Sequence, residues 1–66
     1  MTLLYVYIDN GEVKRQEYSG QDAARKNIKK QLNFTHHLPV HVIVDGEKVL
    51  DGDNVMLWIL EKIDLE

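Results

Sequence analysis

Three histidines are the side chains of this 66-residue chain with the clearest potential for chemistry. His36, His37 and His41 lie on either side of Pro39, the single proline, and imidazole binds metal ions or exchanges protons near neutral pH. Ligands of a zinc or nickel ion lie roughly 2.1 Å from it, whereas an extended chain separates His37 from His41 by about 13 Å. We therefore expect no metal site and interpret the histidines as polar residues of a loop and a strand end, with a pH-sensitive contact as the alternative.

Other catalytic groups do not fall into a pattern that indicates a reaction. Ser19 and the tyrosines lack the surroundings of an activated nucleophile, such as a Gly-x-Ser-x-Gly turn. Asp51 and Asp53 flank Gly52, where a turn and a helix start account for both carboxylates, and the sequence has no twelve-residue calcium loop. It also has no glycine-rich phosphate-binding loop. We expect no enzyme activity and no cofactor.

Length and composition predict a single small domain over residues 1–66. The sequence has no cysteine, which excludes disulfides and thiolate metal sites, and we expect a cytoplasmic protein. The first ten residues lack a basic segment and contain a short apolar run, so we expect neither a signal peptide nor a membrane span. Chains below ~70–80 residues usually need extra stabilisation, for example by a second subunit.

Charge is distributed unevenly between the two halves of the chain. The net charge is −3, but residues 1–33 carry six basic side chains against four acidic ones, and residues 34–66 carry two against seven. This dipolar pattern disfavours a general polyanion-binding protein. It is compatible with two copies that pair basic end to acidic end, or with ordinary solvated charge.

Turn signals divide the chain into two hairpins, each followed by a helix. Asn-Gly at 10–11 and Asp-Gly at 45–46 favour two-residue hairpin turns, and the first turn sets Ile8 opposite Val13. The predicted elements are strands at 3–8 and 12–18, a helix at 21–32, a loop at 33–39, strands at 40–44 and 47–50, and a helix at 54–63. The expected fold is α+β, a two-layer ββαββα domain whose four-stranded sheet carries both helices on one face.

The first predicted helix has an apolar stripe beside a basic arc. Ser19 is its expected N-cap, and Ala24, Ile28 and Leu32 recur with helical spacing and should face the core. The basic arc consists of Arg25, Lys26, Lys29 and Lys30. These four side chains are the candidate contacts for an anion or a nucleic acid, an alternative function that we rank below protein binding.

Residues 38–62, LPVHVIVDGEKVLDGDNVMLWILEK, resemble the C-terminal half of the thioredoxin and glutaredoxin fold. In that family a loop ending in proline enters a strand, a tight hairpin returns, and a Gly-containing turn opens the last helix. Pro39, the turn at 45–46 and Gly52 stand at the matching places. The cysteine motif and the helix that carries it are missing, so the resemblance implies an αββα unit without redox activity. It implies, as a second alternative, a peptide or small ligand bound near Pro39. It also implies that the bond before Pro39 could be cis, although trans is the default for such bonds.

The last predicted helix carries apolar side chains outside its core arc. At about 100° per residue, one arc of the helix holds Val55, Met56, Ile59, Leu60 and Ile63. Leu57 and Trp58 fall outside this arc, beside Glu61. Because tryptophan is enriched among interface hot spots, we predict that Trp58 is an exposed anchor for a partner.

The predicted sheet also has an apolar surplus. The set expected to face the helices is Leu4, Val6, Ile8, Val13, Val42, Val44 and Val49. The set expected on the other face is Leu3, Tyr5, Tyr7, Tyr18, His41, Ile43 and Leu50. A monomer rarely exposes so large an apolar surface, unless the first hairpin twists or a helix crosses over to cover it.

These patterns predict a non-enzymatic protein-binding module. We expect a homodimeric regulator or inhibitor, of the small kind that phages and mobile elements encode. Its expected contact residues are Leu57, Trp58 and Glu61, or the face with Tyr5, Tyr7 and Tyr18, or both.

Overall fold

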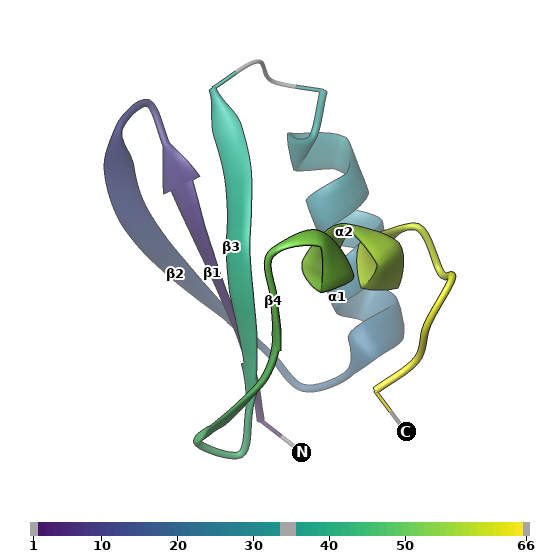
Figure 1. Ribbon diagram of the computed structural model, residues 1–66. Helices are drawn as coiled ribbons and strands as arrows, with labels where there is room; N and C mark the ends of the chain where they lie inside the picture. The colour runs from purple at the N-terminus through teal and green to yellow at the C-terminus, as the bar shows by residue number, and fades with distance from the viewer. Residues whose placement is uncertain (1, 34–35, 66) are drawn as a thin grey trace.

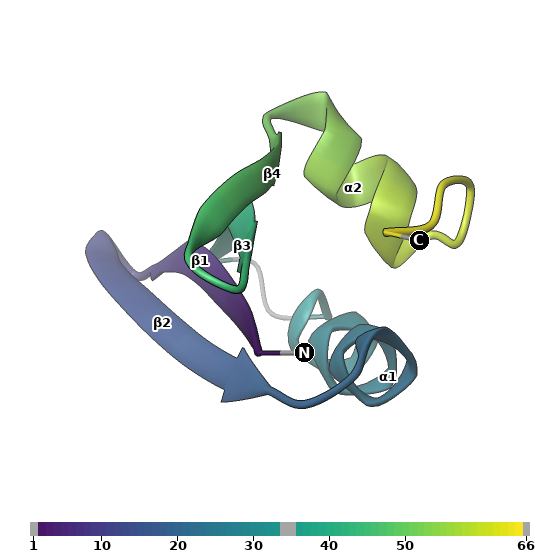
Figure 2. The ribbon, with the colours of Figure 1, turned by 90° about the horizontal axis from the view of Figure 1, so that it is seen from below.

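The computed structural model describes residues 2–33 and 36–65 and confirms the predicted ββαββα order (Figure 1). The elements are β1 (Leu3–Asp9), β2 (Glu12–Tyr18), α1 (Gln21–Gln31), β3 (His37–Val44), β4 (Glu47–Asp51) and α2 (Asp53–Ile59). The strands form one antiparallel sheet with the order β2-β1-β3-β4. Both helices lie on the same side of this sheet (Figure 2), which confirms the two-layer α+β class. In the described part of the chain, no helix has the length and apolar character needed to cross a membrane.

Both hairpin turns form at the predicted positions. Asn10 and Gly11 have φ values of 53° and 85°, and Asp45 and Gly46 have values of 50° and 87°. These left-handed conformations belong to type I′ turns, whose twist matches that of the flanking strands. The two turns therefore set the pairing within each hairpin.

The first hairpin has the predicted register, with Ile8 opposite Val13. The segment before β3 differs from the prediction, because β3 begins at His37 and the expected loop at 33–39 is shorter. Residues 34 and 35 of that loop lie outside the described part of the chain. The peptide bond before Pro39 is trans, and the cis alternative is not adopted.

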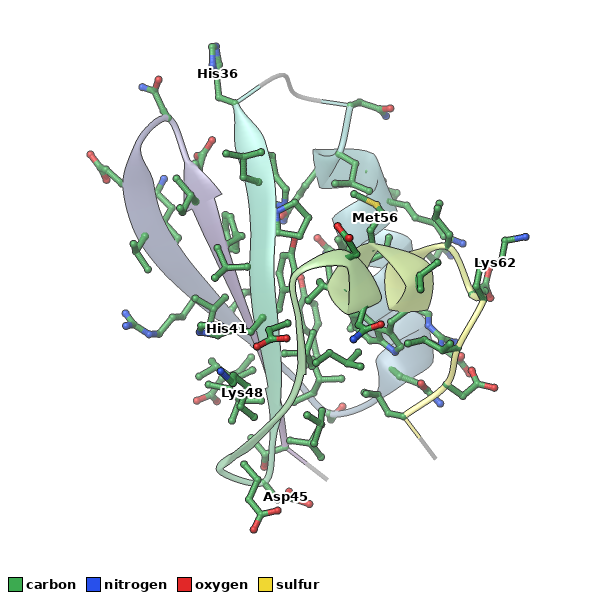
Figure 3. All side chains as sticks on the ribbon, in the orientation of Figure 1. His36, His41, Asp45, Lys48, Met56 and Lys62 are labelled. Carbon is green, nitrogen blue, oxygen red and sulfur yellow. The ribbon has the colours of Figure 1, made fainter. Side chains whose placement is uncertain are left out.

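A β-bulge in β3 changes which of its side chains share a face. Val6 of β1 pairs with His41, whereas the next residue, Tyr7, pairs with Pro39, so that Val40 is the extra residue. A bulge places residues three apart on one side of the sheet, which a regular strand cannot do. His41 therefore lies on the same side as Leu38, away from the helices (Figure 3).

A second bulge has the same effect in β4. The extra residue is Val49, and it brings Lys48 and Asp51 to the side of the sheet away from the helices. The ammonium nitrogen of Lys48 lies 3.3 Å from a carboxylate oxygen of Asp51 on that side. Leu50 packs against the core instead, so the predicted positions of Val49 and Leu50 are reversed.

The core lies between the sheet and the helices. Its fully buried members are Leu3, Tyr5, Ala24, Ile28, Val42, Val55, Trp58 and Ile59. Val42 faces the helices as predicted, but the face assigned to the first hairpin is wrong. Tyr5 is opposite Val42 in the sheet and Leu3 is opposite Val44, so Tyr5 and Leu3 face the helices. The pairing of β1 with β3 determines this outcome, and no tight turn connects those two strands.

Trp58 is a core residue, and its prediction as an exposed anchor is wrong. Its side chain is fully buried, and its indole N–H donates a hydrogen bond to Oε1 of Gln21, 3.1 Å away. The buried residues of α2 are Val55, Trp58 and Ile59. Met56, which the sequence assigns to the core, is 37 % exposed.

The early end of α2 explains this change of face. The helix stops at Ile59 instead of Ile63, and Glu61 adopts a left-handed φ of 63°. The backbone N–H of Lys62 bonds to the carbonyl of Leu57 at 2.8 Å, and that of Glu61 bonds to the carbonyl of Trp58 at 3.0 Å. This pair of bonds is a Schellman motif, which usually has glycine at the left-handed position.

Helix α1 buries the predicted stripe but starts differently. Ala24 and Ile28 are fully buried, and Leu32 is half-buried against the core. The N-cap is Gly20, with no hydrogen bond from a capping side chain, so the prediction of Ser19 as the cap is wrong.

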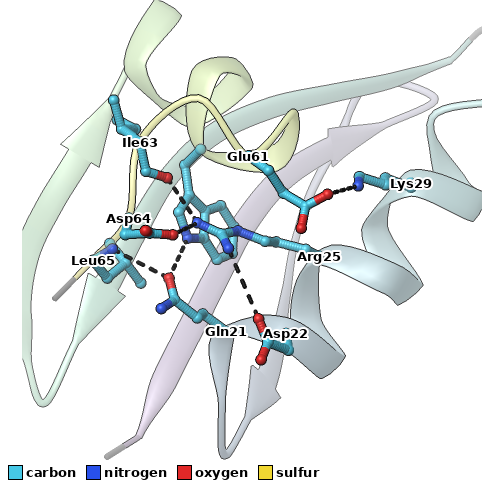
Figure 4. Close-up of polar contacts among 9 residues, drawn as sticks. Gln21, Asp22, Arg25, Lys29, Glu61, Ile63, Asp64 and Leu65 are labelled. Carbon is cyan, nitrogen blue, oxygen red and sulfur yellow. Dashed lines mark hydrogen bonds and ion pairs between the residues drawn. The ribbon is translucent and has the colours of Figure 1, made fainter.

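Arg25 of α1 holds the C-terminal segment against the helix (Figure 4). Its Nη2 donates to the carbonyl of Ile63 at 2.7 Å and to the carboxylate of Asp64 at 2.8 Å. The guanidinium also lies over the ring of Trp58, 5.4 Å from its centroid. Oε1 of Gln21 accepts a further bond from the backbone N–H of Leu65 at 3.2 Å. The residues after α2 thus close one end of the core.

Candidate functional site

The side of the sheet away from the helices, which we call the open face, carries exposed apolar side chains. Leu38 is 60 % exposed and Val13 is 57 % exposed. The strand register arranges the open face in three rows, each of which crosses the sheet in the order β2-β1-β3-β4. The first row is Glu17, Leu4, Ile43 and Lys48. The second row is Arg15, Val6, His41 and Asp51. The third row is Val13, Ile8 and Leu38.

Opposite charges stand at the two ends of the first and second rows. Glu17 on β2 lies across the sheet from Lys48 on β4, and Arg15 lies across from Asp51. Lys48 and Asp51 form an ion pair with each other, whereas no ion pair is formed by Arg15 or Glu17 within residues 2–33 and 36–65. The open face is therefore mostly apolar along its centre, where His41 is a polar member, and it has charges of both signs at its two edges.

The third row ends early, because β4 stops at Asp51 and supplies no side chain beyond Leu38. At this corner the surface forms an open hollow of about 650 Å³. Its lining residues are Ile8, Leu38, Pro39, Val40, His41, Asp51 and Gly52. An apolar side chain from another molecule could enter this hollow.

The helix side of the sheet contains a hydrogen-bonded pair of acid–base groups, Tyr5 and His37. The Tyr5 hydroxyl lies 2.6 Å from Nε2 of His37, and the Tyr7 ring stacks on both, at centroid distances of 5.2 and 4.6 Å. Burial raises the pKa of the Tyr5 hydroxyl well above its usual value and lowers the pKa of His37. Because Tyr5 is fully buried, a substrate cannot reach it, and the pair acts as an internal hydrogen bond between β1 and β3.

The histidines are separated by the sheet. His37 lies on the helix side with Tyr5, and His41 lies on the open face beside Val6. Among the described residues, no three histidine or carboxylate side chains are grouped as metal ligands. His41 is therefore available to a partner molecule and not to an ion shared with His37.

The predicted contact residues do not form one surface. Tyr7 and Tyr18 are partly buried against the core, and burial raises the pKa of Tyr18. With Tyr5 fully buried, the expected tyrosine surface does not exist. Leu57 is 41 % exposed and Glu61 is exposed, so these two remain accessible on the outer side of α2.

The basic arc of α1 is smaller than the sequence indicates. Arg25 is only 4 % exposed, so its prediction as a nucleic-acid contact is wrong: its guanidinium binds the C-terminal segment. Nζ of Lys29 lies 2.6 Å from the carboxylate of Glu61, and this hydrogen bond lowers the pKa of Glu61. Lys26 and Lys30 are exposed.

Sequence reasoning missed the residues that make up the open face. It assigns Val13 to the core and Leu38 to a loop. The Asn-Gly turn does place Val13 beside Ile8, but it does not say which side of the hairpin the helices cover. The bulge in β4 brings Asp51 into the row of Arg15, and the bulge in β3 brings Leu38 beside Ile8. Neither bulge leaves a recognisable pattern in the sequence.

Comparison with known proteins does not place the chain in a family. No family model matches the sequence, no curated protein matches it, and no solved structure matches the fold.

Proposed function

We propose that this chain is a protein-binding module, of the regulator or inhibitor kind, that binds its partner through the open face. The observation that supports this best is the high exposure of Leu38 and Val13, 60 % and 57 %, in one row with Ile8. Apolar side chains scattered singly on a surface need no explanation, but a contiguous row on a sheet is typical of an interaction surface.

The function is the one expected from the sequence, but the contact residues are those of the open face. Trp58 and Tyr5 are core residues and cannot be the anchors. Leu57 belongs to a second exposed apolar group on α2, with Met56 and Leu60. We favour the open face because it combines exposed apolar side chains, opposite charges at its two edges and a hollow on one side of the sheet.

Paired substitutions on the two surfaces test the proposal. Leu38→Asp places a charge on the open face, and Leu57→Asp does the same at an exposed leucine of α2. The baits are the tagged wild-type chain and the two tagged variants. Each bait is incubated once with untagged wild-type chain and once with a cell lysate. We expect captured protein to be lost with Leu38→Asp and kept with Leu57→Asp. Equal capture by all three baits, or loss only with Leu57→Asp, would exclude the open face as the binding surface.

A peptide or small apolar ligand beside Pro39 is a second candidate, and the hollow of about 650 Å³ at that position favours it. Two-dimensional NMR with a library of short apolar peptides tests this. Saturable shifts confined to Gly52, His41 and their neighbours would support it. Unchanged spectra at millimolar peptide would exclude it.

A further inference from the structure

We propose that the partner of the open face is a second copy of this chain, packed face to face about a two-fold axis that runs parallel to the strands, between β1 and β3. This inference rests on the proposed function and names its partner. It follows from the positions of the charges in the rows of the sheet.

An axis in this direction exchanges the two edges of the sheet and keeps each row opposite itself. Residues of β2 in one copy then face residues of β4 in the other, and β1 faces β3. In the second row, Arg15 of each copy faces Asp51 of the other. In the first row, Glu17 of each copy faces Lys48 of the other. The dimer thus has four charge contacts between an edge of one copy and the opposite edge of the other, and each joins opposite charges. The two edges of the open face are therefore complementary to each other.

In the first and third rows the apolar residues also match under this operation, whereas in the second row Val6 faces His41 of the second copy. Leu4 faces Ile43 of the second copy, and Ile8 faces Leu38. Val13 stands opposite the corner where β4 has already ended, which is the position of the open hollow. The exposed valine of each copy therefore enters the hollow of the other.

The competing two-fold axis, perpendicular to the strands, gives a worse match. It would keep each strand opposite itself and would place Arg15 opposite Arg15 and Asp51 opposite Asp51 in the second row. Like charges that face each other across an interface are destabilising. The charge pattern thus selects one of the two simple face-to-face arrangements.

The size of the open face predicts a reversible dimer. Four strands about 4.8 Å apart and three rows about 6.8 Å apart give a footprint of roughly 400 Å². Stable interfaces bury about 800 Å² on each partner, so we expect a dimer that dissociates on dilution. Exposed ion pairs contribute little to affinity individually, and the charges chiefly determine the orientation of the two copies.

A charge-exchange experiment tests the arrangement. Self-association of the wild-type chain, Arg15→Asp, Asp51→Arg and the double variant is measured by analytical ultracentrifugation from about 1 µM to about 1 mM, the range of weak complexes. Each single variant brings like charges together at two places, and we expect its dimer to be weakened about tenfold. The double variant restores opposite charges and should recover the wild-type affinity. An equimolar mixture of the two single variants should also associate, because both pairs are restored in the heterodimer.

The outcomes separate this inference from the proposed function. A wild-type chain that stays monomeric at 1 mM overturns the dimer, while capture of another protein that depends on Leu38 would leave the proposed function standing. Dimerisation that both single variants leave unchanged, or that the double variant fails to restore, overturns the arrangement. Loss of dimerisation with Leu57→Asp and not with Leu38→Asp would place the contact on α2 and overturn both. Lys62→Asp, a charge change on an exposed residue beyond α2, serves as the control and should leave the dimer unchanged.

Discussion

Trp58 of α2 donates its indole N–H to the side-chain oxygen of Gln21, the first residue of α1, from a position with no solvent exposure. The two helices are therefore joined by a polar bond at the edge of an apolar core. Arg25 lies over the same indole ring and binds the residues that follow α2. Trp58 is thus the point at which both helices and the C-terminal segment meet.

Trp58→Ala is expected to destabilise the fold severely. Removing a fully buried tryptophan typically costs about 3–5 kcal/mol, and small domains have a total stability of the order of 5–15 kcal/mol. Urea unfolding followed by far-UV circular dichroism measures the loss. Leu57→Ala, at the half-exposed neighbour, should cost far less. A Trp58→Ala variant as stable as the wild type would contradict the burial of this side chain.

The contacts of Arg25 predict a local effect on the C-terminal segment. Arg25→Met keeps an apolar stem over Trp58 but removes the bonds to Ile63 and Asp64. Hydrogen bonds from charged groups contribute about 1.5–3 kcal/mol, so we expect a loss of that size in the free energy of unfolding. Hydrogen exchange should also become faster at residues 62–65.

The neighbouring Lys26→Met is the control for this change, because Lys26 is exposed on the same helix. Its effect on stability should lie within about 0.5 kcal/mol. Equal effects of the Arg25 and Lys26 substitutions would mean that the C-terminal segment is not held by Arg25.

Local signals in the sequence predicted local structure well. The two turns, the pairing within the first hairpin and the buried stripe of α1 depend on residues close together in the chain, and all three are confirmed. The fold class follows from the order of those elements. The face of the first hairpin that meets the helices depends instead on the register between β1 and β3, and a shift of one residue reverses it. Both faces of β1 are apolar, so hydrophobic alternation could not select the correct one.

The candidate site could not be predicted for the same reason. Arg15 and Asp51 lie far apart in the chain, and a common row requires the register of three strand pairs and a bulge in β4. The buried face of α2 was predicted wrongly because the helix ends earlier than expected. Leu60 and Ile63 lie beyond the helix, and their inclusion in the predicted core arc moved that arc away from Trp58. The helix ends at a left-handed Glu61, where the sequence lacks the glycine that usually marks such an end.

The left-handed conformation of Glu61 leads to a prediction that isolates backbone strain. Glu61→Gly and Glu61→Ala both remove the ion pair with Lys29, but only glycine adopts a φ of 63° without a steric cost. The cost for other residues is about 1–2 kcal/mol, so the glycine variant should be more stable than the alanine variant by about 1 kcal/mol. Thermal unfolding of the two variants gives this difference. Equal melting temperatures would show that residue 61 does not adopt the left-handed conformation.

The lowered pKa of His37 predicts that the fold loses stability in mild acid. Burial lowers its pKa in the folded chain below the ordinary value of 6.5, although the nearby Asp9 opposes this shift. As the pH falls below about 6.5, the unfolded chain takes up a proton that the folded chain does not bind, and the linkage relation then requires the free energy of unfolding to decrease. Above that pH His37 is neutral in both states and contributes no pH dependence.

The substitution His37→Gln tests this contribution, because an amide can still accept a hydrogen bond from the Tyr5 hydroxyl but does not titrate. Denaturant unfolding between about pH 5 and pH 7.5 should show a shallower loss of stability for this variant than for the wild type. His36→Gln, the same substitution at the exposed neighbour, is the matched control and should keep the wild-type slope. If His37→Gln and the wild type lose stability in parallel, other groups account for the acid sensitivity, and the Tyr5–His37 bond does not hold a neutral imidazole.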